Sequence, residues 1–515
     1  MRLTFAVAVA AGLAASLMVT GCQASGADKT GGQTVALRFA SIDALNDNGQ
    51  SPGPQAFVDG LARISGGNLK AEVATDYGKG DPQAETNLVK AIASGDLDGG
   101  WPASRAFANA GMPGLAALEA PMTITSYAAE KAVVSGPVAP KLLATLDGSG
   151  VVGLGLAVGP LRRPFAAKAP LLGVTDWKGA QFRVFNSPVQ HQAISALGAS
   201  PVDASFDWVD RVRAGTLRGA EFDIAQYAEN GLSSDAGEVT GNVVLWPKVY
   251  VLSLSHKRFD SLTTQQQGWV REAARIATEA SVDFTYDEKT VAQQLCAAGV
   301  HFQQASPDQL SGLRRAFAPT LATMAADATT GPLLRQLQAV AAQHEPDVVT
   351  AGAECSAGSA GGSLGAVPTT KSALPDGVYR AQITTADAVA SLSNQPGLSG
   401  TWTLTVQDGG YQLTCRPTVA SGGDCGGEVT DGPVEAGDLR GTGNTVYFVY
   451  DPKRLSRLTG CRLPPSPVEP GHCWHGPVYR MSWTLSDGRL TFSDFVAAAV
   501  FTDDQFLVKP WRKIA

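Results

Sequence analysis

One arginine lies where a charged side chain is unexpected. Residues 176–187 read DWKGAQFRVFNS, in which Phe182 and Val184 are typical of a short buried β-strand. Arg183 lies between them, and its guanidinium group stays charged in proteins. Because an unpaired buried charge is costly, an anion should lie beside it. The residues alone allow two interpretations: an internal salt bridge with a carboxylate of the protein, or a bound anionic ligand.

The sequence lacks several motifs of common enzymes and cofactor sites. It contains no HExxH or P-loop pattern and only six histidines, so we expect no enzyme and no catalytic residue. The glycine-rich stretch at residues 150–165 includes Pro160 and Pro164, which would break the helix that a dinucleotide site requires. We therefore interpret it as a strand followed by a crossover that carries Arg162 and Arg163, and we expect no cofactor.

The composition limits the class of protein. A chain of 515 residues predicts about two to four domains. Charged residues make up 17% of the chain, which indicates a globular protein with little surface charge. The net charge of −7 argues against a general nucleic-acid binder, because such a protein needs a basic face. Any anion must therefore be held by a local group of arginines.

The N-terminus has the pattern of an export signal. Arg2 precedes an apolar run, and the run ends in VTGC, which is similar to a bacterial lipobox. We predict a lipoprotein signal peptide at residues 1–21, lipidation of Cys22, and a flexible tether at residues 22–36. The predicted location is the extracytoplasmic surface of the cell membrane. A plain secretory signal with an accidental cysteine is the alternative.

Six further cysteines remain, and an even number in an exported chain indicates disulfide bonds. Sequence proximity and domain separation favour one of the fifteen possible pairings: Cys296–Cys355, Cys415–Cys425 and Cys461–Cys473. A metal site is the competing interpretation for three neighbouring residues, His472, Cys473 and His475. Their spacing does not match that of a zinc site, so we expect no metal.

The chain changes character along its length. Strand-like and helix-like segments alternate over residues 37–350, which predicts a parallel α/β sheet, with one unusually long helical stretch near residues 265–298. Residues 351–370 are rich in Gly, Ala and Ser and mark a linker. Residues 371–515 have a period of two and contain two W-T-L segments that each lead into an Asp-Gly turn. We predict a small antiparallel β-barrel or sandwich there.

Several motifs in residues 37–345 occur in the order found in one family. They are AIASGDLDGGW, the crossover LRRPF followed by DWKGAQFRV, and ALGASPVDASFDWVDRVRAGTLRGAEF. Together they resemble the extracytoplasmic solute-binding proteins of TRAP (tripartite ATP-independent) transporters. The resemblance implies a two-lobed, periplasmic-binding-protein-like α/β fold with a long connecting helix.

The resemblance also implies roles for individual residues. Arg183 matches the family arginine that binds a ligand carboxylate as a bidentate pair, and the crossover arginine matches Arg162, or Arg163 if the gap is placed differently. The chain departs from the family at three positions, where Asp207 replaces Glu, Arg218 replaces Asp, and Phe222 replaces a ligand-contacting Asn. Glu221 is kept, and Phe222 predicts a less polar wall. Trp101 is either a second aromatic wall or a core residue.

The expected function is that of a lipid-anchored receptor. It would bind a small organic acid between two lobes and deliver it to a TRAP-type membrane permease. The alternative is an envelope-anchored interaction protein with a vestigial cleft, in which the β-rich tail binds a partner.

Overall fold

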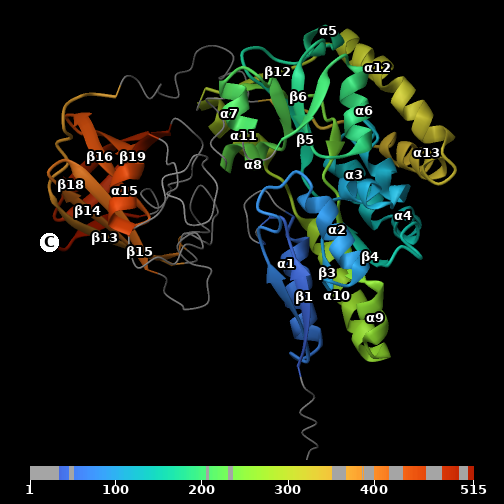
Figure 1. Ribbon diagram of the computed structural model, residues 1–515. Helices are drawn as coiled ribbons and strands as arrows, with labels where there is room; N and C mark the ends of the chain where they lie inside the picture. Colours follow the sequence, from blue (N-terminus) through green and yellow to red (C-terminus); the bar gives the residue numbers. More distant parts are fainter. Residues whose placement is uncertain are drawn as a thin grey trace, which may run out of the picture.

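The computed structural model describes most of the chain. The described residues are 34–43, 45, 51–204, 208–229, 236–297, 299–350, 367–384, 387, 399–416, 433–459, 478–497 and 509–515. They form two α/β lobes and a closed β-barrel (Figure 1). The predicted fold class, a two-lobed α/β protein with an antiparallel β domain, is therefore confirmed.

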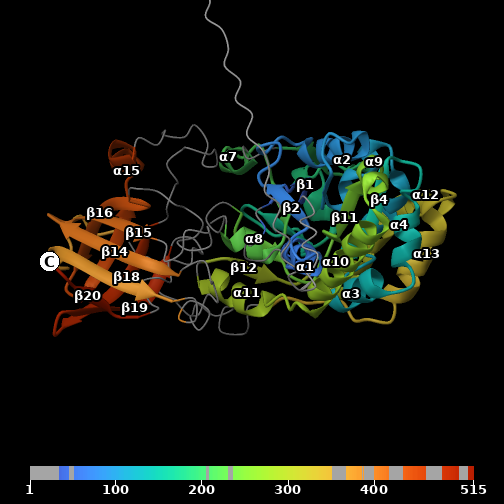
Figure 2. The same cartoon turned by 90° about the horizontal axis from the view of Figure 1, so that it is seen from below.

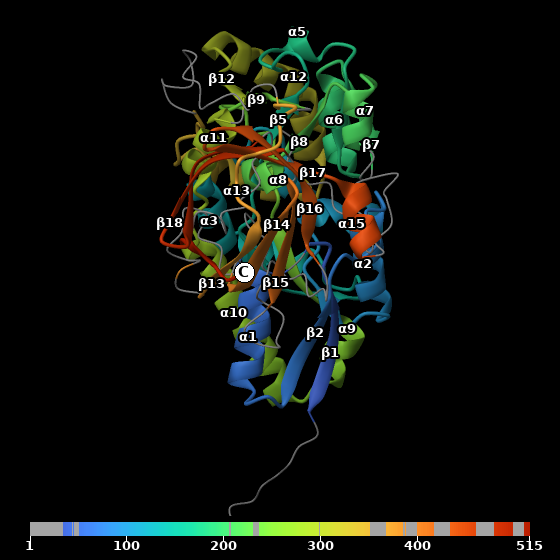
Figure 3. The same ribbon diagram turned by 90° about the vertical axis from the view of Figure 1, so that its left-hand side faces the viewer.

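The first lobe is built on a five-stranded sheet in the order β2-β1-β3-β11-β4. Its strands are β1 (Val35–Ala40), β2 (Leu69–Ala74), β3 (Gly99–Gly100), β4 (Val151–Ala157) and β11 (Tyr250–Ser255). The helices packed in this part are α1 (Gly53–Ile64), α2 (Ala84–Ser94), α3 (Tyr127–Ser135), α4 (Ala139–Ala144), α9 (His256–Ser261) and α10 (Thr264–Asp283), with short 3₁₀ turns η1 (Ser104–Ala106), η2 (Ala108–Ala110) and η3 (Pro113–Glu119). Helix α1 lies beside α10, as Figures 2 and 3 both show.

The second lobe has a seven-stranded sheet in the order β12-β9-β5-β8-β6-β7, with β10 paired to β5. Its strands are β5 (Leu161–Ala166), β6 (Gln181–Val184), β7 (Ser200–Asp203), β8 (Gly219–Phe222), β9 (Glu238–Thr240), β10 (Trp246–Pro247) and β12 (His301–Gln303). The helices that follow these strands are α5 (Val174–Trp177), α6 (Pro188–Ala196), α7 (Trp208–Arg213), α8 (Ile224–Glu229), α11 (Glu288–Ala297) and α12 (Pro307–Ala326). The last helix, α13 (Thr330–Ala341), packs against α3 and η3 of the first lobe.

Both sheets are mixed, which corrects the prediction of a parallel sheet. Strand β1 runs parallel to β2 and β3, but β11 runs antiparallel to β3 and β4. In the second lobe β6 is parallel to β7 and β8, whereas β5 is antiparallel to β8. The antiparallel strands arise because the chain passes from one lobe to the other and later returns. The local strand–helix alternation does not contain this information.

Two of the connections between the lobes run side by side. Residues 158–160 lead from β4 to β5, and the amide of Lys248, just before β11, donates to the carbonyl of Pro160 at 3.0 Å. A Cβ atom on Gly159 would lie 1.7 Å from the carbonyl oxygen of Lys248. Only glycine therefore permits this close approach.

The long helical stretch predicted near residues 265–298 is two helices. Helix α10 ends at Asp283, and Phe284 has an extended backbone (φ −67°, ψ 142°). Helix α11 begins at Glu288, and the Asp287 carboxylate accepts a hydrogen bond from the amide of Thr290 at 3.1 Å. The aromatic and β-branched residues at the break have low helix propensity, and an aspartate favours a new start.

The C-terminal strands close into a barrel in sequence order. They are β13 (Gly377–Ile383), β14 (Gly400–Gln407), β15 (Gly410–Arg416), β16 (Glu435–Thr442), β17 (Thr445–Tyr450), β18 (Tyr479–Ser486), β19 (Arg489–Ala497) and β20 (Trp511–Lys513), with helix α15 (Pro452–Thr459) after β17. Both predicted Asp-Gly hairpins form, because Asp408–Gly409 and Asp487–Gly488 have positive φ angles, as such tight turns require. The barrel has its own apolar core, which includes Tyr379 and Phe448.

Several predictions concern residues that the structure does not describe. Cys22 and the signal peptide lie outside the described residues, as do His472, Cys473 and His475. Cys296 and Cys415 are disulfide-bonded, but their predicted partners also lie outside, so the three pairings stay predictions. Within the described ranges, none of the helices is long and apolar enough to cross a membrane.

Candidate functional site between the lobes

Strand ends from both lobes supply a group of eight charged side chains. In the second lobe, Arg183 lies on β6, and Glu221 and Asp223 lie at and just after the end of β8. In the first lobe, Asp43 follows β1 and Arg105 follows β3. Since β6 is parallel to β8 and β1 is parallel to β3, these residues lie at carboxyl ends of strands, where open α/β sheets bind ligands. The interlobe cluster is completed by Glu85, Arg162 and Lys248.

The second-lobe half of the cluster is centred on Arg162. Its Nε donates to the Glu221 carboxylate at 2.5 Å, and its Nη1 donates to Asp223 at 2.6 Å. Its Nη2 donates to the backbone carbonyl of Glu221 at 3.1 Å. Arg162 therefore has protein partners on all of its nitrogen atoms. Although burial opposes its charge, Glu221 and Asp223 raise the pKa of Arg162 above its usual value.

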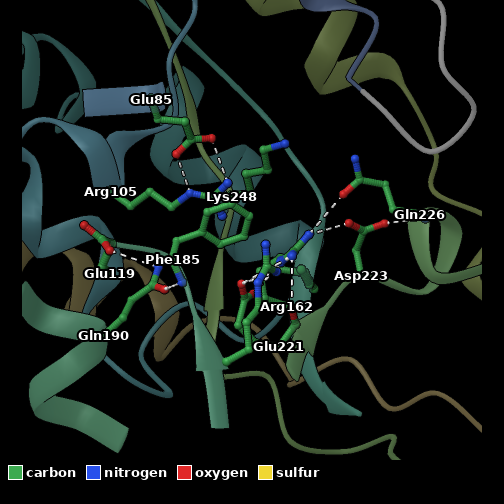
Figure 4. A network of polar contacts seen from close by, with 12 residues as sticks. Glu85, Arg105, Glu119, Arg162, Phe185, Gln190, Glu221, Asp223, Gln226 and Lys248 are labelled. Carbon is green, nitrogen blue, oxygen red and sulfur yellow. Dashed lines mark hydrogen bonds and ion pairs between the residues drawn. The ribbon is translucent and has the colours of Figure 1, made fainter. Parts of the chain in front are cut away.

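The first-lobe half consists of two ion pairs. Arg105 binds Glu85 through Nε at 2.6 Å and Nη2 at 2.7 Å, and Lys248 binds Asp43 at 2.6 Å. Burial opposes ionisation of both carboxyl groups, but Arg105 lowers the pKa of Glu85 and Lys248 lowers that of Asp43. Figure 4 shows the Phe185 ring with the Glu85–Arg105 pair on one side and Arg162 with Glu221 on the other.

Arg183 is the cation of the cluster to which no carboxylate is hydrogen-bonded within the described part of the chain. It is 9% exposed, and its Nε and Nη1 groups are buried without a hydrogen-bond partner from any residue that the structure describes. Among the described residues, the nearest carboxylate oxygen is Oε1 of Glu221, which lies 4.0 Å from Nη1 and already accepts from Arg162. Burial lowers the pKa of Arg183 to about 10; Glu221 opposes this, and Arg162 and Arg105 add to it. At neutral pH Arg183 is therefore charged and has unused donors.

Aromatic rings surround Arg183. Its Cζ atom lies 4.3 Å from the ring centroid of Phe185, 5.8 Å from that of Phe222 and 5.9 Å from that of Trp208. Phe182 and Val184 point into a buried core on the other face of β6, as the alternation along a strand requires. The rings attract the cation through their π faces but offer no hydrogen-bond acceptor comparable to a carboxylate.

The segment after β6 joins the lobes directly. The Asn186 side chain donates to Gln83 at 2.6 Å, and the Asn186 carbonyl accepts from the side chain of Asn109 at 2.9 Å. Phe185 stacks on Arg105 of the first lobe, with 3.1 Å between Cζ and the ring centroid. The lobes are therefore in contact around the cluster, which keeps its charges out of water.

The structure brings together some of the residues predicted from sequence and separates others. Arg183, Arg162, Glu221 and Phe222 lie together. Arg163 does not join them, because it binds Glu288 at 2.7 Å and the carbonyl of Gly241 at 3.2 Å. Trp101 packs in the first-lobe core and donates to Ser41 at 2.8 Å, so of its two interpretations the core residue agrees with the structure. Asp207 lies outside the described residues.

Sequence analysis missed the first-lobe half of the cluster. Asp43, Glu85, Arg105 and Lys248 are far from Arg183 in sequence, and none belongs to a recognised motif. One signal was available, since Arg105 follows the Gly-Gly strand closely, and a polar residue just after a parallel strand is a candidate ligand contact.

Comparison with known proteins places this architecture in a family. The family DctP, described as bacterial extracellular solute-binding protein, family 7, matches residues 49–327. The chain belongs to this family. Two relatives are the C4-dicarboxylate-binding protein DctB of Bacillus subtilis, 24% identical over 51% of this chain and 71% of its own length, and the 2,3-diketo-L-gulonate-binding periplasmic protein YiaO of Escherichia coli, 28% identical over 33% of this chain and 51% of its own.

Solved structures of TRAP periplasmic solute-binding proteins share the two-lobed fold of this DctP-family chain. One from Sulfitobacter sp. NAS-14.1, with bound β-D-galacturonate, is 21% identical and has a TM-score of 0.53, covering 59% of this chain and 100% of its own. Another from Shewanella oneidensis, with bound succinate, is 18% identical with a TM-score of 0.53, covering 60% of this chain and 99% of its own. The resemblance to TRAP solute-binding proteins noted in the sequence is confirmed.

Proposed function

We propose that this chain is a lipid-anchored receptor for a small organic acid, which it delivers to a TRAP-type membrane permease. The observation that carries the proposal is Arg183, a buried arginine with two donors that no described residue accepts from, among cations that are otherwise paired. A ligand carboxylate would accept from the edge of this guanidinium in a bidentate pair. Membership of a family of extracellular solute-binding proteins supports the receptor role, and relatives that bind acids support the ligand class.

Contact between the lobes would strengthen this pair. A charge-assisted hydrogen bond is stronger in a desolvated site, and the aromatic rings around Arg183 exclude water. Phe222, which takes the place of a polar family residue, would present an apolar wall to the acid. The role needs no catalytic group.

The test is calorimetric titration of the purified mature chain with succinate, D-galacturonate, D-glucuronate and 2-acetolactate. We expect at least one acid to bind, and Arg183→Lys to weaken it by about 1–3 kcal/mol, because lysine keeps the charge but loses the planar fork. Arg183→Ala should weaken it more. Both variants should keep nearly the wild-type melting temperature, because no carboxylate of the described residues is hydrogen-bonded to Arg183 and would lose its partner.

Arg275→Lys is the control, since Arg275 pairs with Glu272 and Glu279 on the exposed face of α10. It should leave affinity unchanged. If Arg183→Ala causes a large fall in melting temperature with unaltered affinity, Arg183 is an internal salt-bridge residue and the proposal is wrong. Loss of radiolabelled palmitate incorporation in Cys22→Ser would test the anchor separately.

A further inference from the structure

Arg105 is a third buried arginine at the site, beside Arg183 and Arg162, and it comes from the opposite lobe. It is 3% exposed, and two of its nitrogen atoms are occupied by Glu85. Its Nη1 group is buried and has no hydrogen-bond partner among the described residues. Since buried polar groups in native proteins almost always have partners, this donor calls for an acceptor that the described residues do not supply.

Arg105 and Arg183 share one aromatic ring. The Cζ atom of Arg105 lies 3.1 Å from the Phe185 centroid and that of Arg183 lies 4.3 Å from it. The two guanidinium groups therefore cannot be farther apart than the sum of these distances. Stacking covers a face of each group and leaves the N–H edges, which are the parts that bind carboxylates. Two cations this close repel each other, and Arg105 contributes to the lowered pKa of Arg183.

We propose that Arg105 is a second ligand-contacting residue and determines which acids the site binds; this inference rests on the proposed function. The site would take acids that carry a second oxygen acceptor near the carboxylate bound by Arg183. An acid with one carboxylate and an alkyl chain would satisfy the donors of Arg183 and leave Nη1 of Arg105 without an acceptor. A second carboxylate, keto or hydroxyl oxygen would satisfy both arginines and link the two lobes. Leaving a buried donor unpaired costs more free energy than a typical hydrogen bond contributes. The site should therefore discriminate strongly against acids that lack the second oxygen.

Arg163 provides a matched comparison within the same protein. It too is a buried arginine paired with one glutamate, Glu288, and it too has one nitrogen, Nη2, without a partner among the described residues. Its contacts are with Glu288 and Gly241, so it stands apart from the Phe185 stack. A change at Arg163 therefore perturbs a similar buried ion pair outside the site.

The experiment compares two double variants that each remove an ion pair without leaving a buried charge. They are Arg105→Met with Glu85→Gln, and Arg163→Met with Glu288→Gln. Each protein is titrated with succinate, D-galacturonate, D-glucuronate and 2-acetolactate, and with butanoate, which has a single carboxylate and no other oxygen. Arg105→Lys is measured as well, in case the first double variant does not fold.

We expect wild type to bind at least one of the four oxygen-rich acids at least tenfold more tightly than butanoate. The Arg105 double variant or Arg105→Lys should lose that preference, with affinity for the favoured acid falling tenfold or more, while the Arg163 double variant stays within twofold. If wild type binds butanoate equally well, or if the Arg105 variants keep the wild-type preference, the inference is wrong although the receptor proposal stands. If wild type binds none of the five acids, both fail.

Discussion

Glu119 shows how one buried carboxyl group can make the region beside the site sensitive to pH. It lies at the end of η3, its Oε2 accepts hydrogen bonds from Ser187 at 2.7 Å and from Gln190 at 3.1 Å, and its Oε1 is buried without a partner among the described residues. Burial raises its pKa from 4.5 to about 7; the hydrogen bonds and Arg105 oppose the rise, and Glu85 adds to it.

A pKa above that of the unfolded chain means that the folded state binds this proton more tightly. The stability that the protonated Glu119 contributes to the folded state is therefore fully present below pH 4.5 and is lost as the pH rises to about 7. Glu119→Gln, which mimics the neutral acid, should be more stable than wild type at pH 8 by up to about 3 kcal/mol, and nearly equal at pH 4.5. Urea unfolding of both proteins across this range measures the difference. A constant difference at all pH values would mean that Glu119 does not titrate there.

Sequence patterns could predict some residues of the site but not their partners. Arg183 could be identified because it is a charged residue inside an apolar strand. Phe222 could be identified because it differs from the residue that the family motif has at this position. Whether Arg183 had an internal partner could not be predicted, since this depends on Glu221 being taken by Arg162. Arg105 was missed because only the folded chain brings it to the Phe185 ring.

Among the elements, the paired connections between the lobes are the most constrained. Gly159→Ala would push a methyl group into the Lys248 carbonyl, and backbone cannot move aside as a side chain can. We expect a loss of at least about 1–3 kcal/mol in the free energy of unfolding, together with weaker acid binding, because Lys248 belongs to the cluster.

Gly268 on α10 is the matched control, since a Cβ atom there meets nothing within 4 Å. Gly268→Ala should stabilise the protein by about 0.5–1 kcal/mol, because alanine favours helix more than glycine does. Chemical denaturation of both variants measures the two changes in the free energy of unfolding, which should have opposite signs. If the two alanine variants behave alike, the close approach at Gly159 is not a constraint.

Single elements were predicted more reliably than their connections. Both Asp-Gly hairpins of the barrel form where the sequence predicts them, with Asp408–Gly409 and Asp487–Gly488 at positive φ angles. These features depend on neighbours in sequence, which is why they could be predicted. The mixed order of the sheets depends on where the chain returns between lobes, and no local pattern records that.

At the scale of the whole molecule, the described apolar cores fall into two sets that share no residue. The barrel core uses residues 374–511, and the cores of the lobes use residues within 35–349. We therefore expect two unfolding transitions in calorimetry, one for the lobes and one for the barrel. A bound acid should raise the midpoint temperature of the lobe transition only.

Core variants assign the two transitions. Leu404→Ala in the barrel and Leu61→Ala in the first lobe each remove a fully buried side chain and should cost about 2–5 kcal/mol. Leu404→Ala should lower the midpoint temperature of the barrel transition only, and Leu61→Ala that of the lobe transition only. Leu404→Ala should leave acid affinity unchanged. A single transition that both variants lower equally would show that the bodies unfold as one unit.

The closure of the barrel brings its first and last strands together. Strand β20 pairs with β13, and Val378 exchanges backbone hydrogen bonds of 2.8 Å with Ile514 and Ala515. The start of the first barrel strand thus lies next to residues 514–515. A body with adjacent ends can be circularly permuted, or inserted as a cassette into a surface loop of another protein, without altering its strand order. The barrel is therefore a portable unit, which genetic recombination could attach to a solute receptor without redesigning either partner.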